Sequence, residues 1–356
     1  MTGASDLSRL PWLAEPLQQA LATRRGHALL VHGPRGVGQF ELSVALAQAW
    51  LCESESVPLA SRPCYVCASC RLVRARSHSD LLVLLPEALR EAVGWSAAPG
   101  EGEEGGESGK STKKPSKEIR VEAVRAAIGF ATTTSARGRG KVLVVHPAER
   151  MNDVAANAFL KTLEEPPGDA RFILSSAAPD ALLPTIRSRC QAVPLRVPGP
   201  DQAAAWLEAQ GIADATTLLA ACGGQPQEVL AWAALGIDAA AWRALPGRVG
   251  RGDASALHGL PLPLAVEMLQ KLCHDAAAIA CGAAPRFFPS ESLSAGAALS
   301  ALSGWSRQLT RMATEADHPW IVDLSVESLV EQGRQALKTA RSEHRPAQVL
   351  SLNSPR

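Results

Sequence analysis

The sequence predicts an α/β domain, in which helices cover both faces of a parallel β-sheet, followed by a small helical domain and a further all-helical domain. Three observations predict this fold class. Short apolar runs alternate with helix-like segments in the first half of the chain, a glycine-rich turn joins the first run to a helix, and the pattern beyond residue 262 is helical without a strand signal.

The first predicted strand is the apolar run 28–32, which is too short for a typical helix. It ends in the glycine-rich turn 33–38, after which apolar residues recur at helical spacing from Phe40 to Leu51. Parallel strands that are buried on both faces appear in sequence as continuous apolar runs. Three further runs therefore predict strands, at residues 81–85, 142–145 and 172–175.

Length, composition and charge narrow the class of protein. A chain of 356 residues is long enough for two or three domains. Hydrophobic residues make up 46% and aromatic residues only 4%, which favours packed helices. The net charge of +1 excludes a global positive field that would attract nucleic acid or anionic membrane. No apolar stretch approaches about 18 residues and no leader pattern is seen, so we expect a cytoplasmic protein without membrane contact.

Two interruptions divide the chain. Residues 97–117 are rich in Gly, Glu, Ser and Lys with almost no apolar side chains, so we expect a disordered insertion there. The proline-rich segment 194–200 precedes two or three short helices and marks a boundary near residue 198. We therefore expect an α/β domain over 1–198, a small helical domain over 199–247 and an all-helical domain over 248–356, helical from 262 onward except at 285–289.

The turn 33–38 has the spacing of a phosphate-binding loop without its chemistry. A working loop reads G-x-x-x-x-G-K-[ST], in which the lysine neutralises the β- and γ-phosphates and the hydroxyl binds magnesium. Gly33 and Gly38 keep the spacing, with Gly36 between them, but Gln39 and Phe40 replace the lysine and the hydroxyl residue. The alternative interpretation is a tight turn between strand and helix and nothing more.

The second element that should position the metal is missing as well. After the strand 142–145, where an acidic pair should bind magnesium and polarise water, the sequence has His146 and Pro147. Because both elements are absent, we expect no ATP hydrolysis and no ATP cofactor. The remaining backbone amides leave weak nucleotide binding open.

Four of the eight cysteines are closely spaced. Cys52, Cys64, Cys67 and Cys70 give the pattern C-x11-C-x2-C-x2-C, which predicts a tetrahedral zinc site in a module over residues 52–70. In a reducing compartment such a cluster indicates metal rather than disulfides. Four thiolates fill the coordination shell without the nearby His78, so the site should be structural. The alternative is four separately buried thiols.

With these features the chain resembles the delta-prime subunits of the bacterial DNA polymerase III clamp loader, a family of AAA+ proteins. The likeness runs over nearly the whole length. Four stretches carry it: the degenerate glycine loop with the cysteine quartet after its helix, NAFLKTLEEPP at 157–167, LPTIRSRC at 183–190 and KLCHD at 271–275.

The resemblance implies an AAA+ domain, a three-helix lid and a helical collar that closes a five-membered ring. It implies gamma or tau and delta subunits as partners, with the sliding clamp and primed DNA contacted through the complex. The subunit would then belong to the DNA polymerase holoenzyme, a nucleotidyltransferase, without catalysis of its own. Arg189, in Ser-Arg-Cys, matches the arginine that enters the ATP site of a neighbouring subunit. Gln227 stands where motor subunits have a lid arginine, which again fits a non-hydrolysing member.

Two other interpretations stay open at this point. The first is an active ATPase of the gamma or tau type, which Gln39, Phe40, His146 and Pro147 oppose. The second is a zinc-dependent DNA-binding module in which basic residues after the quartet contact phosphates. The residues concerned are Arg71, Arg74 and Arg76. No aromatic or wider basic stripe accompanies them, so a solvated helix face is the simpler interpretation.

Overall fold

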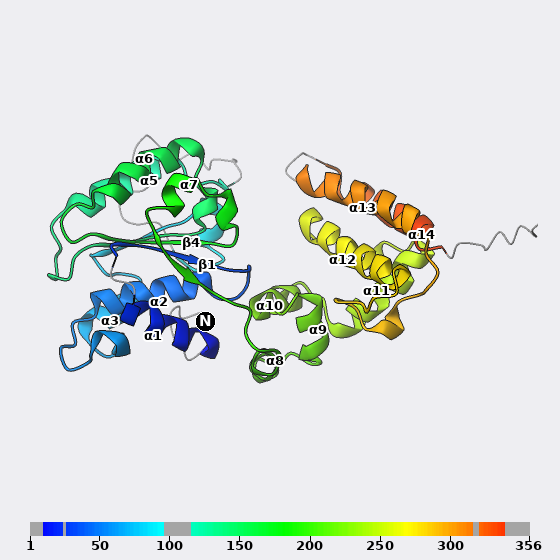
Figure 1. Cartoon of the computed structure of the whole chain (residues 1–356), viewed down its shortest axis with the longest axis horizontal. Helices are drawn as coiled ribbons and strands as arrows, with labels where there is room; N and C mark the ends of the chain where they lie inside the picture. Colours follow the sequence, from blue (N-terminus) through cyan, green and yellow to red (C-terminus); the bar gives the residue numbers. More distant parts are fainter. Residues whose placement is uncertain (1–9, 24–25, 96–114, 316–319, 339–356) are drawn as a thin grey trace, which may run out of the picture. The chain divides into compact units, whose positions relative to one another are not determined.

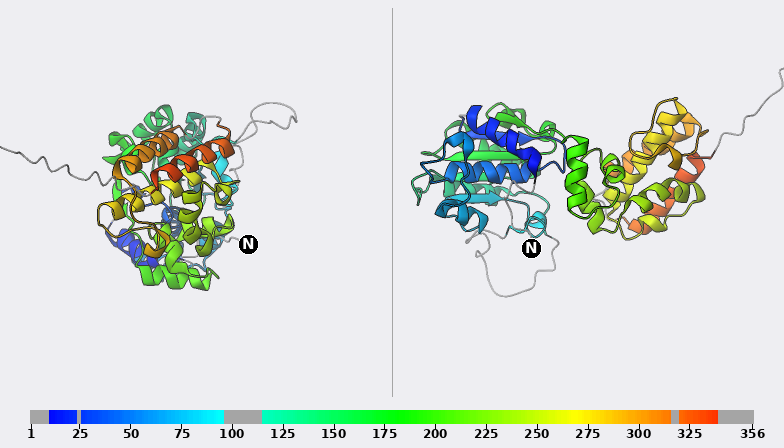
Figure 2. Two further views of the ribbon diagram at one scale, coloured as in Figure 1. Left: turned by 90° about the vertical axis from the view of Figure 1, so that its right-hand side faces the viewer. Right: turned by 90° about the horizontal axis from the view of Figure 1, so that it is seen from below.

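The computed structural model describes residues 10–23, 26–95, 115–315 and 320–338. Most of the predicted disordered insertion, residues 97–114, lies outside them. The chain divides into two compact units, residues 1–202 with 225–228 and residues 203–224 with 229–356. The first unit contains the sheet and the second is built from helices (Figure 1), as the two further views in Figure 2 also show.

The first unit has a five-stranded parallel sheet with the order β2-β3-β4-β1-β5. In β1, Leu30 pairs with Leu174 of β4 on one side and with Ala192 of β5 on the other. The strands are β1 (Ala28–His32), β2 (Leu81–Leu84), β3 (Val142–Val145), β4 (Arg171–Ser176) and β5 (Gln191–Pro194). The predicted fold class is therefore confirmed, whereas the edge strand β5 was not among the predicted strands.

Helices cover both faces of this sheet (Figure 1). On one face lie α1 (Ala14–Thr23), α2 (Gln39–Leu51) and α3 (Ala68–Arg74), and on the other lie α5 (Val121–Thr132), α6 (Asp153–Glu164) and α7 (Pro184–Arg187). Helix α2 packs on β1, β3 and β4 and is buried on nearly all sides. A helix that is apolar all round requires such a central position. A one-turn helix, α4 (Glu87–Arg90), follows β2.

The second unit has one hydrophobic core that involves all of its helices. The helices are α8 (Pro200–Ala209), α9 (Ala215–Ala221), α10 (Pro226–Ala234), α11 (Ala239–Arg251), α12 (Leu262–Ala280), α13 (Leu299–Thr314) and α14 (Val322–Ala336), of which α8 and α10 begin in the first unit. The expectation of helix beyond 262 with a break only at 285–289 is too simple. The segment 281–298 contains a single 3-10 turn, Ser290–Ser292.

A buried carboxylate explains how this irregular segment is held. Asp275 is fully buried on α12, and it accepts hydrogen bonds from the backbone N–H groups of Arg286, Phe287 and Phe288 at 2.7 to 2.9 Å. The ring of Phe288 in turn stacks on Trp242 at 3.9 Å. Asp275 of the KLCHD motif therefore fixes this loop within the second unit.

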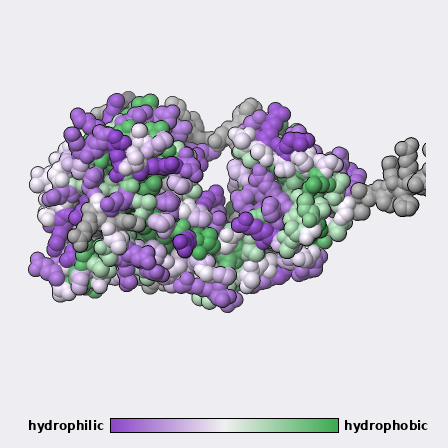
Figure 3. Space-filling model, viewed as in Figure 1, coloured by the Kyte–Doolittle hydropathy of each residue, from purple (hydrophilic) through white to green (hydrophobic). Residues whose placement is uncertain are grey.

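The visible surface differs between the two units. Hydrophilic residues dominate the visible face of the first unit, with small hydrophobic areas between them, whereas a larger hydrophobic area is visible on the second unit (Figure 3). Among the described helices, none combines the length and the apolar character that crossing a bilayer requires.

Candidate functional site

The glycine loop joins β1 to α2, and the first side chain of α2 donates hydrogen bonds to the backbone of the loop. Gly36 and Gly38 adopt φ values of 72° and 104°, which favour glycine. The side chain of Gln39, at the position of the motor lysine, donates from Nε2 to the carbonyl oxygens of Gly33 at 2.8 Å and Pro34 at 2.5 Å. Gln39 is only 6% exposed. The side chain that should reach toward phosphates is thus engaged within the loop.

The N-terminal segment closes the loop from one side. The indole N–H of Trp12 donates to the carbonyl of Val37 at 2.8 Å. A Cβ at Gly38 would lie 2.8 Å from the side chain of Leu13 and 3.1 Å from that of Leu10, so these leucines pack directly on the glycine. Both leucines are buried. The loop is therefore packed against apolar side chains where it enters α2.

Residues 227 and 228 at the start of α10, which belong to the first unit, also contact the loop. Arg35 binds Glu228 through two bonds, Nε to Oε1 at 2.7 Å and Nη2 to Oε2 at 2.6 Å. A Cβ at Gly36 would lie 2.7 Å from the Cγ of Glu228, so this carboxylate-bearing side chain lies on the loop backbone. The N–H of Gln227 donates to the carbonyl of Gly36 at 3.2 Å, and its side chain donates to Glu41 at 2.6 Å. The basic side chain of the loop, Arg35, is thus already paired with a carboxylate.

The position of the magnesium ligand is aromatic. Phe40 packs against His146 with ring centroids 5.0 Å apart and against Trp95 at 6.1 Å. The Nδ1 atom of His146 is hydrogen-bonded to the hydroxyl of Ser175 at 2.8 Å. Burial lowers the pKa of His146 to about 4, so the ring is neutral at pH 7. Neither a magnesium ligand nor an acidic pair stands at these positions.

The four cysteines of the predicted quartet come together. Their sulfur atoms all lie within 4.8 Å of one another, and the Sγ atoms of Cys64 and Cys70 are 3.9 Å apart. A tetrahedral zinc ion with Zn–S bonds of about 2.3 Å places its sulfurs about 3.8 Å apart, so the cluster fits a metal of this size. Cys52 and Cys70 are fully buried.

Local backbone geometry favours an anionic sulfur at Cys64. The N–H of Cys67 donates to the sulfur of Cys64 at 3.3 Å, and the N–H of Cys70 donates to that of Cys67 at 3.4 Å. Burial acts to raise the pKa of Cys64, but backbone N–H groups at Cys67 and Val66 lower it to about 6. Tyr65 takes the left-handed conformation, with φ of 61°, in the turn between them. The turn therefore favours thiolate, the form that binds zinc, at Cys64, whereas burial raises the pKa values of Cys52 and Cys70.

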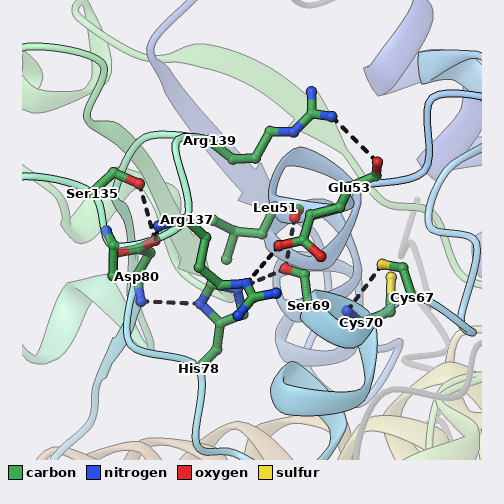
Figure 4. Close-up of polar contacts among 11 residues, drawn as sticks. Leu51, Glu53, Cys67, Ser69, Cys70, His78, Asp80, Ser135, Arg137 and Arg139 are labelled. Atoms are coloured by element: carbon green, nitrogen blue, oxygen red, sulfur yellow. Dashed lines mark hydrogen bonds and ion pairs between the residues drawn. The ribbon is translucent and has the colours of Figure 1, made fainter.

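Polar contacts tie the cysteine module to the rest of the first unit (Figure 4). The hydroxyl of Ser69 donates to the carbonyl of Leu51 at 2.7 Å and accepts from Nε2 of His78 at 2.6 Å. The N–H of Asp80 donates to Nδ1 of His78 at 3.0 Å. His78 is therefore a buried, neutral link, and its pKa is lowered by burial. Both of its ring nitrogens are engaged in these hydrogen bonds.

The chain of contacts continues to the loop before β3. The carboxylate of Asp80 is fully buried, and it accepts from the hydroxyl of Ser135 and the N–H groups of Ala136 and Arg137 at 2.8 to 3.0 Å. It also pairs with Lys141 at 3.0 Å. Burial acts to raise the pKa of Asp80, but these hydrogen bonds lower it. Arg137 then binds Glu53, beside the first cysteine, at 2.5 Å (Figure 4).

Arg189 follows α7 and is held by its own chain. Its Nη1 donates to the carbonyl of Thr185 at 2.8 Å and lies 3.4 Å from the Ser188 hydroxyl, and its Nη2 pairs with Glu164 at the end of α6. The side chain is 33% exposed. Arg187, the other arginine of the motif, instead pairs with Asp180 at 2.5 Å.

The predicted residues therefore fall into three separate places: the loop with Gln39 and Phe40, the cysteine cluster, and Arg189. Sequence reasoning missed the partners that fix them, because ion pairs such as Arg35 with Glu228, 193 residues apart, follow no local motif. Of the basic residues considered for DNA binding, Arg71 and Arg74 are exposed, while Arg76 lies over the ring of Trp95 at 5.5 Å.

The sheet, the glycine loop and the covering helices define an AAA+ domain whose glycine loop is closed by the protein's own side chains. Residues 11–198 match the family model described as DNA polymerase III, delta subunit. This match covers more than half of the chain, and the chain therefore belongs to that family. The similar proteins described next are delta-prime subunits.

Delta' subunits of other bacteria are similar to this chain. The DNA polymerase III subunit delta' of Pseudomonas aeruginosa is 39% identical over 224 residues, which cover 59% of this chain and 58% of that protein. The subunit delta' of Escherichia coli is 33% identical over 228 residues, 62% of this chain and 60% of that protein. The chain thus spans somewhat over half the length of these relatives. A solved gamma-subunit-related protein of Thermotoga maritima aligns over 92% of this chain and 100% of its own, with 17% identity and a TM-score of 0.46.

Proposed function

We propose that this chain is a non-hydrolysing subunit of the DNA polymerase III clamp loader, which helps to load the sliding clamp onto primed DNA. Its partners would be the gamma or tau and delta subunits. The observation that carries the proposal is the closed glycine loop, in which Gln39 binds the loop carbonyls and Phe40 packs on His146. Phosphoryl transfer requires the protein to place a cation on the phosphates and to position a magnesium ion. Gln39 and Phe40 supply neither.

The second part of the proposal is that Arg189 acts in the ATP site of a neighbouring subunit. Phosphoryl transfer develops charge on the γ-phosphate oxygens, and a guanidinium supplied in trans accelerates it by roughly 10³ to 10⁵. Arg189 lies on the surface after a one-turn helix and keeps a third of its side chain exposed. Lysine should not replace it, because only the planar fork binds two oxygens at once.

The cysteine cluster would hold one structural zinc ion, with Cys52, Cys64, Cys67 and Cys70 as ligands. The fit of the sulfur separations supports this, and four thiolates leave no position for a substrate. For the domains, we propose an α/β domain over 1–198, a lid over 199–247 and a collar over 248–356. The resemblance to clamp-loader subunits supports these limits.

The test uses the reconstituted complex with the other loader subunits of the same genome. Arg189→Ala should leave assembly intact and lower the DNA- and clamp-stimulated ATPase rate, although only in part if other subunits supply their own arginines. Arg187→Ala is the matched control, because Arg187 belongs to the same motif but pairs with Asp180. If Arg187→Ala impairs loading and Arg189→Ala does not, the arginine is misassigned. If neither matters, the chain is a scaffold only.

A further inference from the structure

The guanidinium of Arg189 has hydrogen-bond acceptors for only some of its N–H groups. Its Nη1 and Nη2 have acceptors in Thr185 and Glu164. Its Nε is buried and makes no hydrogen bond within the described residues. Buried donors are normally satisfied, because an unsatisfied one loses its hydration without compensation. The observed position therefore satisfies only part of the donor capacity of this side chain.

The ion pair between Arg189 and Glu164 is weak enough that a stronger acceptor can replace the carboxylate. The carboxylate side chain is 47% exposed and the arginine 33% exposed, so water screens their attraction. The ion pair joins Nη2 to Oε1, and the side-on edge formed by Nε and Nη2 has no two-bond partner, because Nε makes no hydrogen bond within the described residues. A phosphate group presents the paired oxygens and the charge that this edge can bind.

We infer that Glu164 is a positioning residue that holds Arg189 in a resting position, from which the γ-phosphate of a neighbouring subunit's ATP withdraws it. This inference rests on the proposed role of Arg189 as an arginine supplied in trans. Glu164 competes with the nucleotide for the same guanidinium. ATP binding at the shared site therefore has to overcome the ion pair before the arginine can act.

The expected signature separates ATP affinity from turnover. Glu164→Gln removes the competing charge and keeps the shape, so KM for ATP at the shared site should fall about two- to fivefold, the range expected for an exposed ion pair. The kcat value should not fall, since Glu164 does not contact the nucleotide in this scheme. Glu164→Asp keeps the charge and should stay closer to the parent value.

The experiment measures DNA- and clamp-stimulated ATP hydrolysis by the full reconstituted loader over a range of ATP concentrations. The control is Glu165→Gln, the adjacent exposed carboxylate, which pairs with no cation within the described residues. It should leave KM unchanged. Combining Glu164→Gln with Arg189→Ala should show no shift beyond that of Arg189→Ala alone, because the two residues act on one guanidinium.

The outcomes distinguish the two claims. If Arg189→Ala changes ATP hydrolysis but Glu164→Gln behaves like Glu165→Gln, the resting-position idea is wrong and the arginine supplied in trans stands. If Glu164→Gln lowers kcat as Arg189→Ala does, Glu164 orients the active arginine and the inference is overturned. If Arg189→Ala itself has no effect, the proposed role of Arg189 fails and the inference fails with it.

Discussion

Arg35 and Glu228 form a two-bond ion pair across the glycine loop, with N–O distances of 2.7 and 2.6 Å, although 193 residues separate them in sequence. The carboxylate side of this pair is the better buried, at 16% exposed against 69% for the arginine. The pair neutralises the only basic side chain within the loop segment 33–38. Phosphates approaching the loop would meet an arginine whose charge is already paired.

Removing that carboxylate should increase nucleotide affinity. We expect Glu228→Ala to strengthen binding of a fluorescent ATP analogue by roughly five- to tenfold, because about 1 kcal/mol of charge repulsion is removed and Arg35 is released. Glu208→Ala, an exposed carboxylate on α8, is the control and should change nothing. Equal binding by both variants would show that the side chains of Leu10, Leu13 and Gln39, rather than charge, close the loop.

Binding should not become hydrolysis. The double variant Gln39→Lys with Phe40→Thr restores the motif in the loop, yet His146 and Pro147 still provide no ligand for magnesium and no base for water. We expect no magnesium-dependent phosphate release from the isolated chain in single-turnover measurements. Turnover in this variant would mean that another element positions the metal.

Metal analysis should find about one zinc per chain in freshly purified protein. Cys64→Ser should bring the content below half an equivalent and increase hydrogen exchange around residues 48–80, because formation of the site is coupled to folding. The all-helical second unit should be unaffected. Cys281→Ser is the control, since Cys281 is exposed and lies outside the cluster. Full metal content in Cys64→Ser would exclude Cys64 as a ligand.

The Asp80 carboxylate should be a major contributor to the stability of the first unit. Asp80→Ala leaves the ammonium of Lys141, 8% exposed, without its buried partner, and it frees the N–H groups of Ala136 and Arg137. We expect a loss of about 3 to 5 kcal/mol in the free energy of unfolding by urea. Asp180→Ala, which removes a carboxylate that is 96% exposed, should cost less than about 0.5 kcal/mol.

Acid should destabilise the first unit through His146. Its folded pKa of about 4 lies below the unfolded value of about 6.5, so the unfolded chain takes up the proton first. The contribution is complete above pH 6.5 and decreases as the pH falls toward 4, by up to about 3 kcal/mol. His146→Phe should flatten urea stability between these pH values, whereas His258→Gln, at an exposed histidine, should not. Unchanged pH dependence in His146→Phe would contradict this assignment.

How much the sequence could predict depends on burial and on the distance between partners. Strands β1 and β3 were predicted at their observed residues, because burial on both faces gives continuous apolar runs. Strand β5 lies at the sheet edge with only Val193 buried, so its sequence carries no such run. The cysteine cluster was predicted because metal ligands need close spacing. The contacts of Glu228 and Glu164 join distant segments, and no local pattern marks them.

The closed loop also limits how such a protein could change over evolutionary time. Lysine at position 39 would give up two hydrogen bonds and bury an ammonium, and a smaller residue at position 40 would leave a gap beside His146 and Trp95. Each single step toward a working ATP site would therefore lower stability before it gave any catalytic benefit. Under the proposed non-hydrolysing role, gaining a working ATP site would therefore require several substitutions at once.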